Sequence, residues 1–160
     1  MSETGGSWQA PEPEAGPAPG IEFASPGARL VGYIVDIVIQ FMIVFTLGVL
    51  SVLLAVVFWP FAVISALAII AVSVIYFPFF WVRGGQTPGM SLMKIKVVRD
   101  ADGGPITWGP AILRWIGFWI STVVFYIGFI WIFLDKRRRG WMDLIAGTVV
   151  VAVPPPPYTE

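Results

Sequence analysis

The chain contains no cysteine and no histidine among its 160 residues. Their absence excludes zinc sites built on thiolate or imidazole, disulfide frameworks, and every mechanism that needs a thiol nucleophile or an imidazole base. The sequence has no paired acids, nucleophile–base set or phosphate-binding loop to replace them. We therefore expect no enzymatic activity, no catalytic residues, no metal site and no cofactor.

Charge is also scarce. Charged residues make up 12% of the chain and apolar residues 57%, and the mean hydropathy is +0.81. Residues 37–82 run without a single charged side chain. This composition indicates an integral membrane protein whose first partner is the lipid bilayer. We expect no nucleic-acid partner, although the overall charge by itself says nothing about partners, because the acids and the bases are unevenly distributed along the chain.

Two stretches have the length of transmembrane helices. Residues 29–59 exceed the roughly 20 residues that cross a bilayer, so this helix must tilt or end early. Trp59 and Pro60 provide an interfacial aromatic residue and a break, and residues 61–82 supply the second span. We therefore predict an all-α membrane protein in which two transmembrane helices form a hairpin.

Both ends of the chain differ from this membrane domain, which we place at residues 26–153. Residues 1–25 are rich in proline, glycine and glutamate and predict a disordered tail. Residues 154–160 form a second, proline-rich tail. The polar start does not fit a cleaved secretory signal, so we interpret the first hydrophobic helix as a retained membrane anchor.

A small β element is expected outside the bilayer. Residues 94–98 alternate polar and apolar side chains, residues 106–108 can return as a second strand, and residues 147–153 offer another. These strands would satisfy one another's backbone groups.

A third hydrophobic segment, residues 111–134, leaves the topology open. If it spans, the loop at 84–110 and the chain after residue 134 lie on opposite faces, and their strands cannot meet. Both regions are rich in lysine and arginine, which marks both as cytoplasmic by the positive-inside rule. We therefore favour an interfacial, broken or re-entrant segment with a bend near residues 126–128, and keep a plain third span as the alternative. The expected location is the inner (cell) membrane, multi-pass, with a cytoplasmic N-terminus.

Asp36 is the acid that needs an explanation. It lies two turns past Arg29, inside the first hydrophobic helix, where an unpaired carboxylate costs at least ~2.5 to 3.5 kcal/mol. Helical side chains lean toward the N-terminus, so Arg29 reaches outward, and Arg114 is the better candidate partner. The functional interpretation is an intramembrane ion or proton site. The structural interpretation is a packing acid tied to an arginine or to backbone donors.

The second charged feature is a basic run close to Asp143. We interpret it as a cluster at the membrane boundary with its counter-charge, able to bind anionic lipid. The run consists of Lys136, Arg137, Arg138 and Arg139.

Several motifs occur together in order: ARL at 28–30, YIVD at 33–36, GQTPG at 85–89 and WMDLIAGTVVV at 141–151. Together they resemble the RDD family of small, mainly bacterial membrane proteins, whose name denotes one arginine and two aspartates. The resemblance implies that the signature residues are Arg29, Asp36 and Asp143. Members commonly carry a lysine after the TPG and a histidine before the last aspartate, where this chain has Met90 and Met142.

The resemblance and the buried acid lead to one expected function and one alternative. The family is suspected of transport, so we expect transport or accessory handling of a small ion (Na⁺ or H⁺) with Asp36 as the polar site. Two or three helices enclose too little space for a pathway, which implies a homo-oligomer or another membrane protein as partner. The alternative is a non-transporting membrane scaffold that binds lipid or a partner membrane protein.

Overall fold

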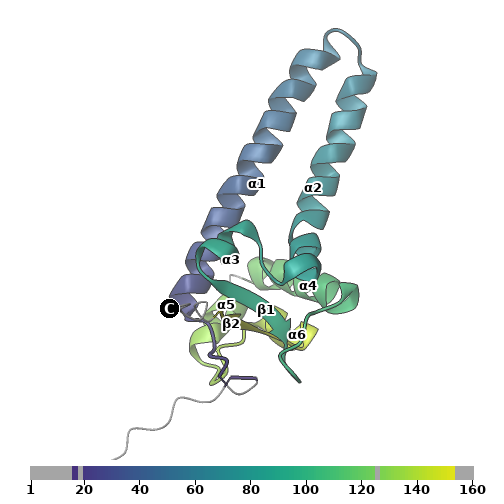
Figure 1. Ribbon diagram of the computed structural model, residues 1–160. Helices are drawn as coiled ribbons and strands as arrows, with labels where there is room; N and C mark the ends of the chain where they lie inside the picture. Colours follow the sequence, from purple (N-terminus) through teal and green to yellow (C-terminus); the bar gives the residue numbers. More distant parts are fainter. Residues whose placement is uncertain (1–15, 18–19, 125–126, 154–160) are drawn as a thin grey trace, which may run out of the picture.

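The computed structural model describes residues 16–17, 20–124 and 127–153 (Figure 1). Its largest feature is a hairpin of two long helices, α1 (Pro26–Ala55) and α2 (Pro60–Gly84). Ser25 caps α1, because its Oγ accepts a hydrogen bond from the Ala28 amide at 3.2 Å. Pro60 begins α2, where its fixed φ suits the first helical turn. The predicted hairpin is confirmed.

The hairpin is apolar over most of its surface. The most apolar 18-residue windows of α1 and α2 have mean hydropathies of 2.6 and 2.4, and each helix is long enough to cross a bilayer. Their buried residues lie only near the base, where the chain enters α1 and leaves α2. An apolar surface of this extent fits hydrocarbon and not water. The molecule is a membrane protein with two firm spans.

The base of the hairpin carries a small cap, which we define as residues 85–124 and 127–153. Its centre is a two-stranded antiparallel sheet of β1 (Ile95–Arg99) and β2 (Thr148–Ala152), with Val97 opposite Val150. Two short helices complete this part of the cap: α3 (Pro88–Leu92) precedes β1, and α6 (Trp141–Ala146) precedes β2. The small β element is confirmed.

Two boundaries differ from the sequence-based expectation. Residues 106–108 do not form a strand, because Thr107 is the N-cap of helix α4 (Trp108–Val123). The position beside β2 is taken instead by residues before α1: Phe23 forms a β-bridge with Val151, and the Ala24 amide donates to the Val150 carbonyl at 2.9 Å. Residues 22–24, which composition alone assigns to the N-terminal tail, therefore belong to the folded unit.

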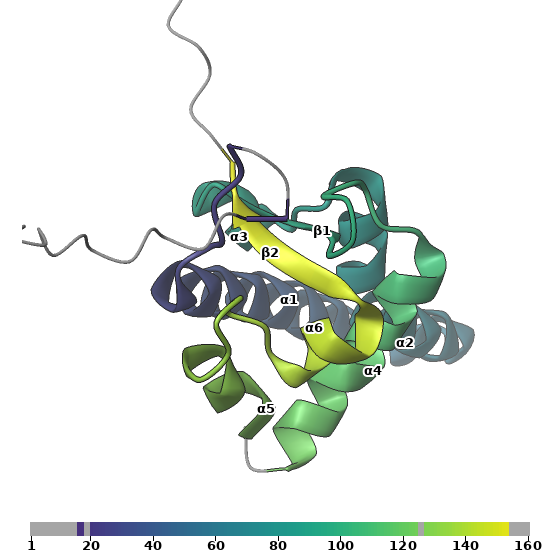
Figure 2. The ribbon, with the colours of Figure 1, turned by 90° about the horizontal axis from the view of Figure 1, so that it is seen from below.

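The third hydrophobic segment is bent. Helix α4 is followed by α5 (Ile127–Ile130) and the 3₁₀ helix η1 (Trp131–Phe133), and the two arms meet at an angle of 111°. α4 lies across the base of the hairpin (Figures 1 and 2). The break between the two arms falls between Val123 and Ile127; residues 125 and 126, and with them part of the bend predicted near residues 126–128, lie outside the described residues.

The pairing of β1 with β2 decides the topology. These strands flank the bent segment in the sequence, so both of its ends lie at the cap. Asp100, just after β1, also forms ion pairs with Arg137 and Arg139 beyond the segment. A straight third span would have separated these partners by the thickness of the bilayer. The interfacial, broken or re-entrant alternative is therefore the one that the fold adopts.

Candidate functional site

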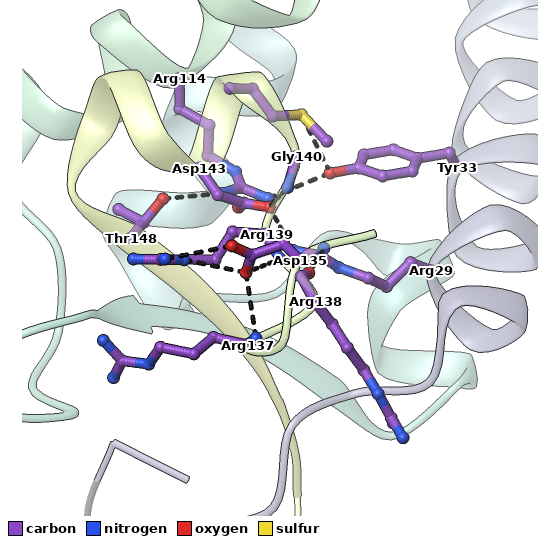
Figure 3. A network of polar contacts seen from close by, with 11 residues as sticks. Arg29, Tyr33, Arg114, Asp135, Arg137, Arg138, Arg139, Gly140, Asp143 and Thr148 are labelled. Atoms are coloured by element: carbon purple, nitrogen blue, oxygen red, sulfur yellow. Dashed lines mark hydrogen bonds and ion pairs between the residues drawn. The ribbon is translucent and has the colours of Figure 1, made fainter. Parts of the chain in front are cut away.

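Two separate buried polar clusters lie at the junction of the hairpin and the cap. The first, which we call the arginine–aspartate cluster, consists of Arg29, Arg114 and Asp143 (Figure 3). The second, which we call the Asp36 cluster, consists of Asp36, Tyr76, Thr87 and Gly89. They divide the three residues implied by the family resemblance between two sites.

In the arginine–aspartate cluster, one carboxylate receives two guanidinium groups. Arg29 Nη2 lies 2.6 Å from Asp143 Oδ2, and Arg114 Nη1 donates to Asp143 Oδ1. All three side chains are 1% exposed or less. The Gly140 amide adds a third donor to Asp143, at 2.9 Å. The cluster ties α1, α4 and α6 together with charge-assisted hydrogen bonds.

The two arginines have further partners. Arg114 donates to Thr148 Oγ1 at 2.8 Å and to the Tyr33 hydroxyl at 3.1 Å, and its guanidinium lies 4.9 Å from the centre of the Trp81 ring. Arg29 Nη1 donates to the Arg138 carbonyl at 2.5 Å. The cation–π contact and the two hydroxyl acceptors therefore give the buried guanidinium of Arg114 partners besides Asp143.

The cluster carries more positive than negative charge. Burial alone raises the pKa of the Asp143 carboxyl, but the guanidinium groups of Arg114 and Arg29 and the Gly140 amide outweigh it and hold this pKa below its usual range. Asp143 is therefore ionised at neutral pH, and one carboxylate faces two permanently charged guanidiniums. In addition, Arg29 Nε and Arg114 Nε are buried without a hydrogen-bond partner among the described residues.

The Asp36 cluster has a different composition. The Asp36 carboxylate accepts hydrogen bonds from the Thr87 hydroxyl, the Gly89 amide (2.8 Å) and the Tyr76 hydroxyl (3.2 Å), and it is completely buried. Within the described residues no cation pairs with Asp36. The prediction that Arg114 pairs with Asp36 is wrong, because the bend after α4 places Arg114 beside Asp143.

The GQTPG motif provides two of these donors. Thr87 caps α3, since its Oγ1 accepts from the Met90 amide at 3.2 Å, and the same hydroxyl donates to Asp36. Gly89 allows the close approach that follows: a Cβ there would lie 2.1 Å from the Gly32 carbonyl oxygen. The motif is therefore a docking turn that fixes the start of the cap to α1.

The basic run at residues 136–139 is partly neutralised. Arg137 and Arg139 form ion pairs with Asp100, and Arg139 also pairs with Asp135. Burial raises the pKa of Asp135, but its hydrogen bonds from Arg139 outweigh burial and lower that pKa overall. Lys136 and Arg138 are exposed and have no ion pair within the part of the chain that the structure describes. The predicted lipid patch was expected to use all four basic side chains. Only two of them, Lys136 and Arg138, are not neutralised by a described acid.

Sequence reasoning missed the neutral polar partners: Tyr33, Tyr76, Thr87 and Thr148. A signal existed for Tyr33, which lies one turn from Arg29 on the same helix face. Met90 and Met142, which replace the common lysine and histidine, are fully buried, and Tyr33 donates to the Met142 sulfur at 3.6 Å. Among the described residues no three Asp, Glu, His or Cys side chains gather into a possible metal site.

Known proteins place the chain in a family. Residues 23–147 match the model of the RDD family. The chain is 32% identical over 69 residues to the proline-rich antigen homolog of Mycobacterium tuberculosis (strain H37Rv), which covers 43% of this chain and 29% of that protein. The proline-rich antigen of Mycobacterium leprae (strain TN) is also 32% identical over 69 residues, covering 43% and 28%.

A further relative comes from another organism. The uncharacterized protein YxaI of Bacillus subtilis (strain 168) is 33% identical over 88 residues, covering 54% of this chain and 57% of that protein. The chain spans less than a third of the length of the mycobacterial relatives it matches. No solved structure matches it. Because the family model covers well over half of the sequence, the chain belongs to the RDD family.

Proposed function

We propose that this protein is a non-enzymatic, non-transporting membrane scaffold that binds lipid or a partner membrane protein. The observation that carries the proposal is the complete burial and hydrogen bonding of the Asp36 carboxylate. Asp36 is the only acid in α1 or α2, it is completely buried, and three donors from the protein itself occupy its oxygens. A carboxylate satisfied in this way serves packing, because its hydrogen bonds offset the cost of burial.

Small-ion handling is the second candidate, and one observation favours it. Asp36 has no cation partner within the described residues, so its charge is balanced only by neutral donors. Ionisable groups of this kind inside membranes commonly mark proton or ion routes. A transport role would also require a homo-oligomer or a partner protein, since two spans do not enclose a pathway.

A flux assay separates the two candidates. The purified chain is reconstituted into liposomes carrying a pH or Na⁺ gradient, and its decay is compared with that in empty liposomes and in liposomes containing Asp36→Asn. The scaffold proposal expects the three decay rates to agree. Faster decay with the parent chain, lost in Asp36→Asn while folding is kept, would overturn the proposal in favour of ion handling.

We extend the proposal to location and orientation. All ten lysines and arginines lie at the base of the hairpin or in the cap, and the turn that joins α1 to α2 has none. By the positive-inside rule this asymmetry supports a cell-membrane protein whose cap and N-terminus face the cytoplasm. The exposed apolar faces of the hairpin are available for a second copy of the chain or for another membrane protein.

A further inference from the structure

An apolar groove runs along the first part of α1, between this helix and the arm formed by α5 and η1. Its volume is about 280 Å³, slightly below the roughly 300 to 1,000 Å³ of typical small-ligand sites. Leu30, Ile34 and Ile37 line one wall, and Phe129 and Phe133 line the other. Leu30 and Ile34 are more than half exposed, so the groove is open toward the lipid.

The end of the groove near the start of α1 is positively charged. Arg29 lines it, is 1% exposed, and keeps its Nε without a hydrogen-bond partner among the described residues. Arg29 belongs to the arginine–aspartate cluster, in which two guanidiniums face one carboxylate. The Arg138 carbonyl accepts a hydrogen bond from Arg29 Nη1 at 2.5 Å, so the backbone of the basic run lies beside Arg29, and the Arg138 and Lys136 side chains of that run are exposed. This end therefore has a surplus of cations and a buried donor in need of an acceptor.

The direction of the groove matches that of a membrane lipid. Its lining on α1 extends from Pro26 to Ile37, about 16 Å along the helix axis. Arg29 lies near the headgroup end, and Ile37 lies deeper, at the start of the uncharged run. A phospholipid placed here would set its phosphate beside the cations and one acyl chain against the apolar walls.

We propose that the groove between α1 and the α5–η1 arm binds one anionic phospholipid, with its acyl chain along Leu30, Ile34 and Ile37 and its headgroup against Arg29, Lys136 and Arg138. This inference rests on the proposed scaffold function and names its ligand class. The surplus charge of the arginine–aspartate cluster selects an anionic headgroup over a zwitterionic one. The bound lipid would also hold the α5–η1 arm against the hairpin.

Native mass spectrometry of the full chain in mild detergent tests the proposal. The probes are phosphatidylglycerol and phosphatidylcholine with identical acyl chains, added in equal amounts. We expect one phosphatidylglycerol per chain, retained about tenfold better than phosphatidylcholine, which corresponds to one or two favourable cation contacts. Equal retention of the two lipids by the parent chain would overturn the proposal.

Matched variants locate the site. Leu30→Trp fills the groove, and Leu53→Trp places the same residue at an equally exposed position of α1 outside it, since the two leucines are 60% and 63% exposed. We expect the first to abolish the preference for phosphatidylglycerol and the second to keep it. Ile34→Trp repeats the test if Leu30→Trp does not fold. Retention by both groove variants at the level of Leu53→Trp would overturn the proposal.

Two double variants, each of which removes two positive charges, test the headgroup contact. Lys136→Gln with Arg138→Gln should reduce phosphatidylglycerol retention to the level of phosphatidylcholine, whereas Arg83→Gln with Lys94→Gln removes the same charge elsewhere and should not. A dimer that Leu30→Trp dissociates would show a second copy in the groove and would also overturn the proposal. Ion flux in the liposome assay contradicts the scaffold function alone, so the two failures are distinguishable.

Discussion

At the residue scale, the two buried carboxylates Asp143 and Asp36 differ in the kind of partner that they have. Asp143 receives two guanidiniums and a backbone amide, while Asp36 receives two hydroxyls and a backbone amide. Both carboxylates are therefore satisfied, but only Asp143 is paired with opposite charge. Removing either acid leaves buried donors without an acceptor, which costs more than the hydrogen bonds themselves contribute.

The arginine–aspartate cluster predicts a strong coupling between Arg114 and Asp143. Asp143→Leu alone should cost about 3 to 5 kcal/mol, because it leaves two buried guanidiniums without their counter-charge, and Arg114→Leu should cost less, because Asp143 keeps its ion pair with Arg29. The double variant should recover part of that loss. Unfolding followed by the fluorescence of the eight tryptophans in detergent measures the cycle. Additive losses would contradict the contact.

The lowered pKa of Asp143 predicts a pH dependence. The ionised carboxylate stabilises the folded state fully above the pKa of an unfolded aspartate, about 3.9, and this contribution is lost as the pH falls through the lower pKa of the folded protein. The parent should therefore exceed Asp143→Asn in unfolding temperature by a constant amount near neutral pH. The difference should narrow below about pH 4. A constant difference down to about pH 2 would contradict the assignment.

The Asp36 cluster predicts that the stability lost on substituting Asp36 depends on how many acceptor oxygens remain, and not on the lost charge alone. Asp36→Leu leaves three donors unpaired and should cost about 1 to 3 kcal/mol for each that finds no water. Asp36→Asn keeps one acceptor oxygen and should cost less. Gln40→Leu is a control one turn along α1, where the side chain makes only long contacts of 3.4 and 3.5 Å. Equal unfolding temperatures for all three variants would contradict the packing role.

At the element scale, the position of α4 is fixed by close approach to α6. The buried residues of α4 are Ala111, Arg114, Gly117 and Ser121, which form a stripe of mostly small side chains. A Cβ on Gly117 would lie 2.7 Å from the Met142 Cα, so α4 and α6 would have to move apart to accommodate it. The small residues let Arg114 reach Asp143 across this interface.

This packing predicts opposite effects for two alanine substitutions in α4. Gly117→Ala should destabilise the protein by about 1 to 3 kcal/mol, because it forces α6 away. Gly109→Ala has open space around its Cβ and should be neutral or stabilising through helix propensity. Unfolding temperatures of the two variants, measured side by side, check the prediction. Equal effects would mean that the α4–α6 contact is not tight.

At the scale of the whole molecule, the cap closes through contacts between distant parts of the sequence. The arginine–aspartate cluster joins residues 29 and 143, which are 114 positions apart, and β1 pairs with β2 across the bent segment. The folded unit is therefore a hairpin whose two base ends, the sheet and α6 all lie on one side (Figure 1).

This topology predicts the accessibility of single cysteines, since the natural chain has none. Asp102→Cys and Lys136→Cys, both at exposed positions of the cap, should react with a membrane-impermeant thiol reagent from the same side of the membrane. Val57→Cys, at the turn of the hairpin and 80% exposed, should react only from the other side. Labelling of positions 102 and 136 from opposite sides would restore three straight spans.

Part of this fold could be predicted from the amino-acid sequence. The two spans follow from residues 37–82 without charge, and the turn at Pro60 follows from its lack of an amide hydrogen. β1 and β2 follow from their β-branched residues, and the shared side of their loops follows from the distribution of basic residues. The error at residues 106–108 arose because Thr107 serves equally well as a strand residue and as a helix N-cap.

The sequence by itself therefore determined the class of the protein, its membrane segments and the residues of interest: Arg29, Asp36, Arg114 and Asp143. The tertiary structure alone decided which charge pairs with which. Periodicity places a side chain on a face of its own helix, but contact with another helix depends on the 111° bend between α4 and the α5–η1 arm and on the glycine contacts that let α3 and α6 approach. For this reason Arg114 contacts Asp143, and Asp36 is held by a threonine, a tyrosine and a glycine amide.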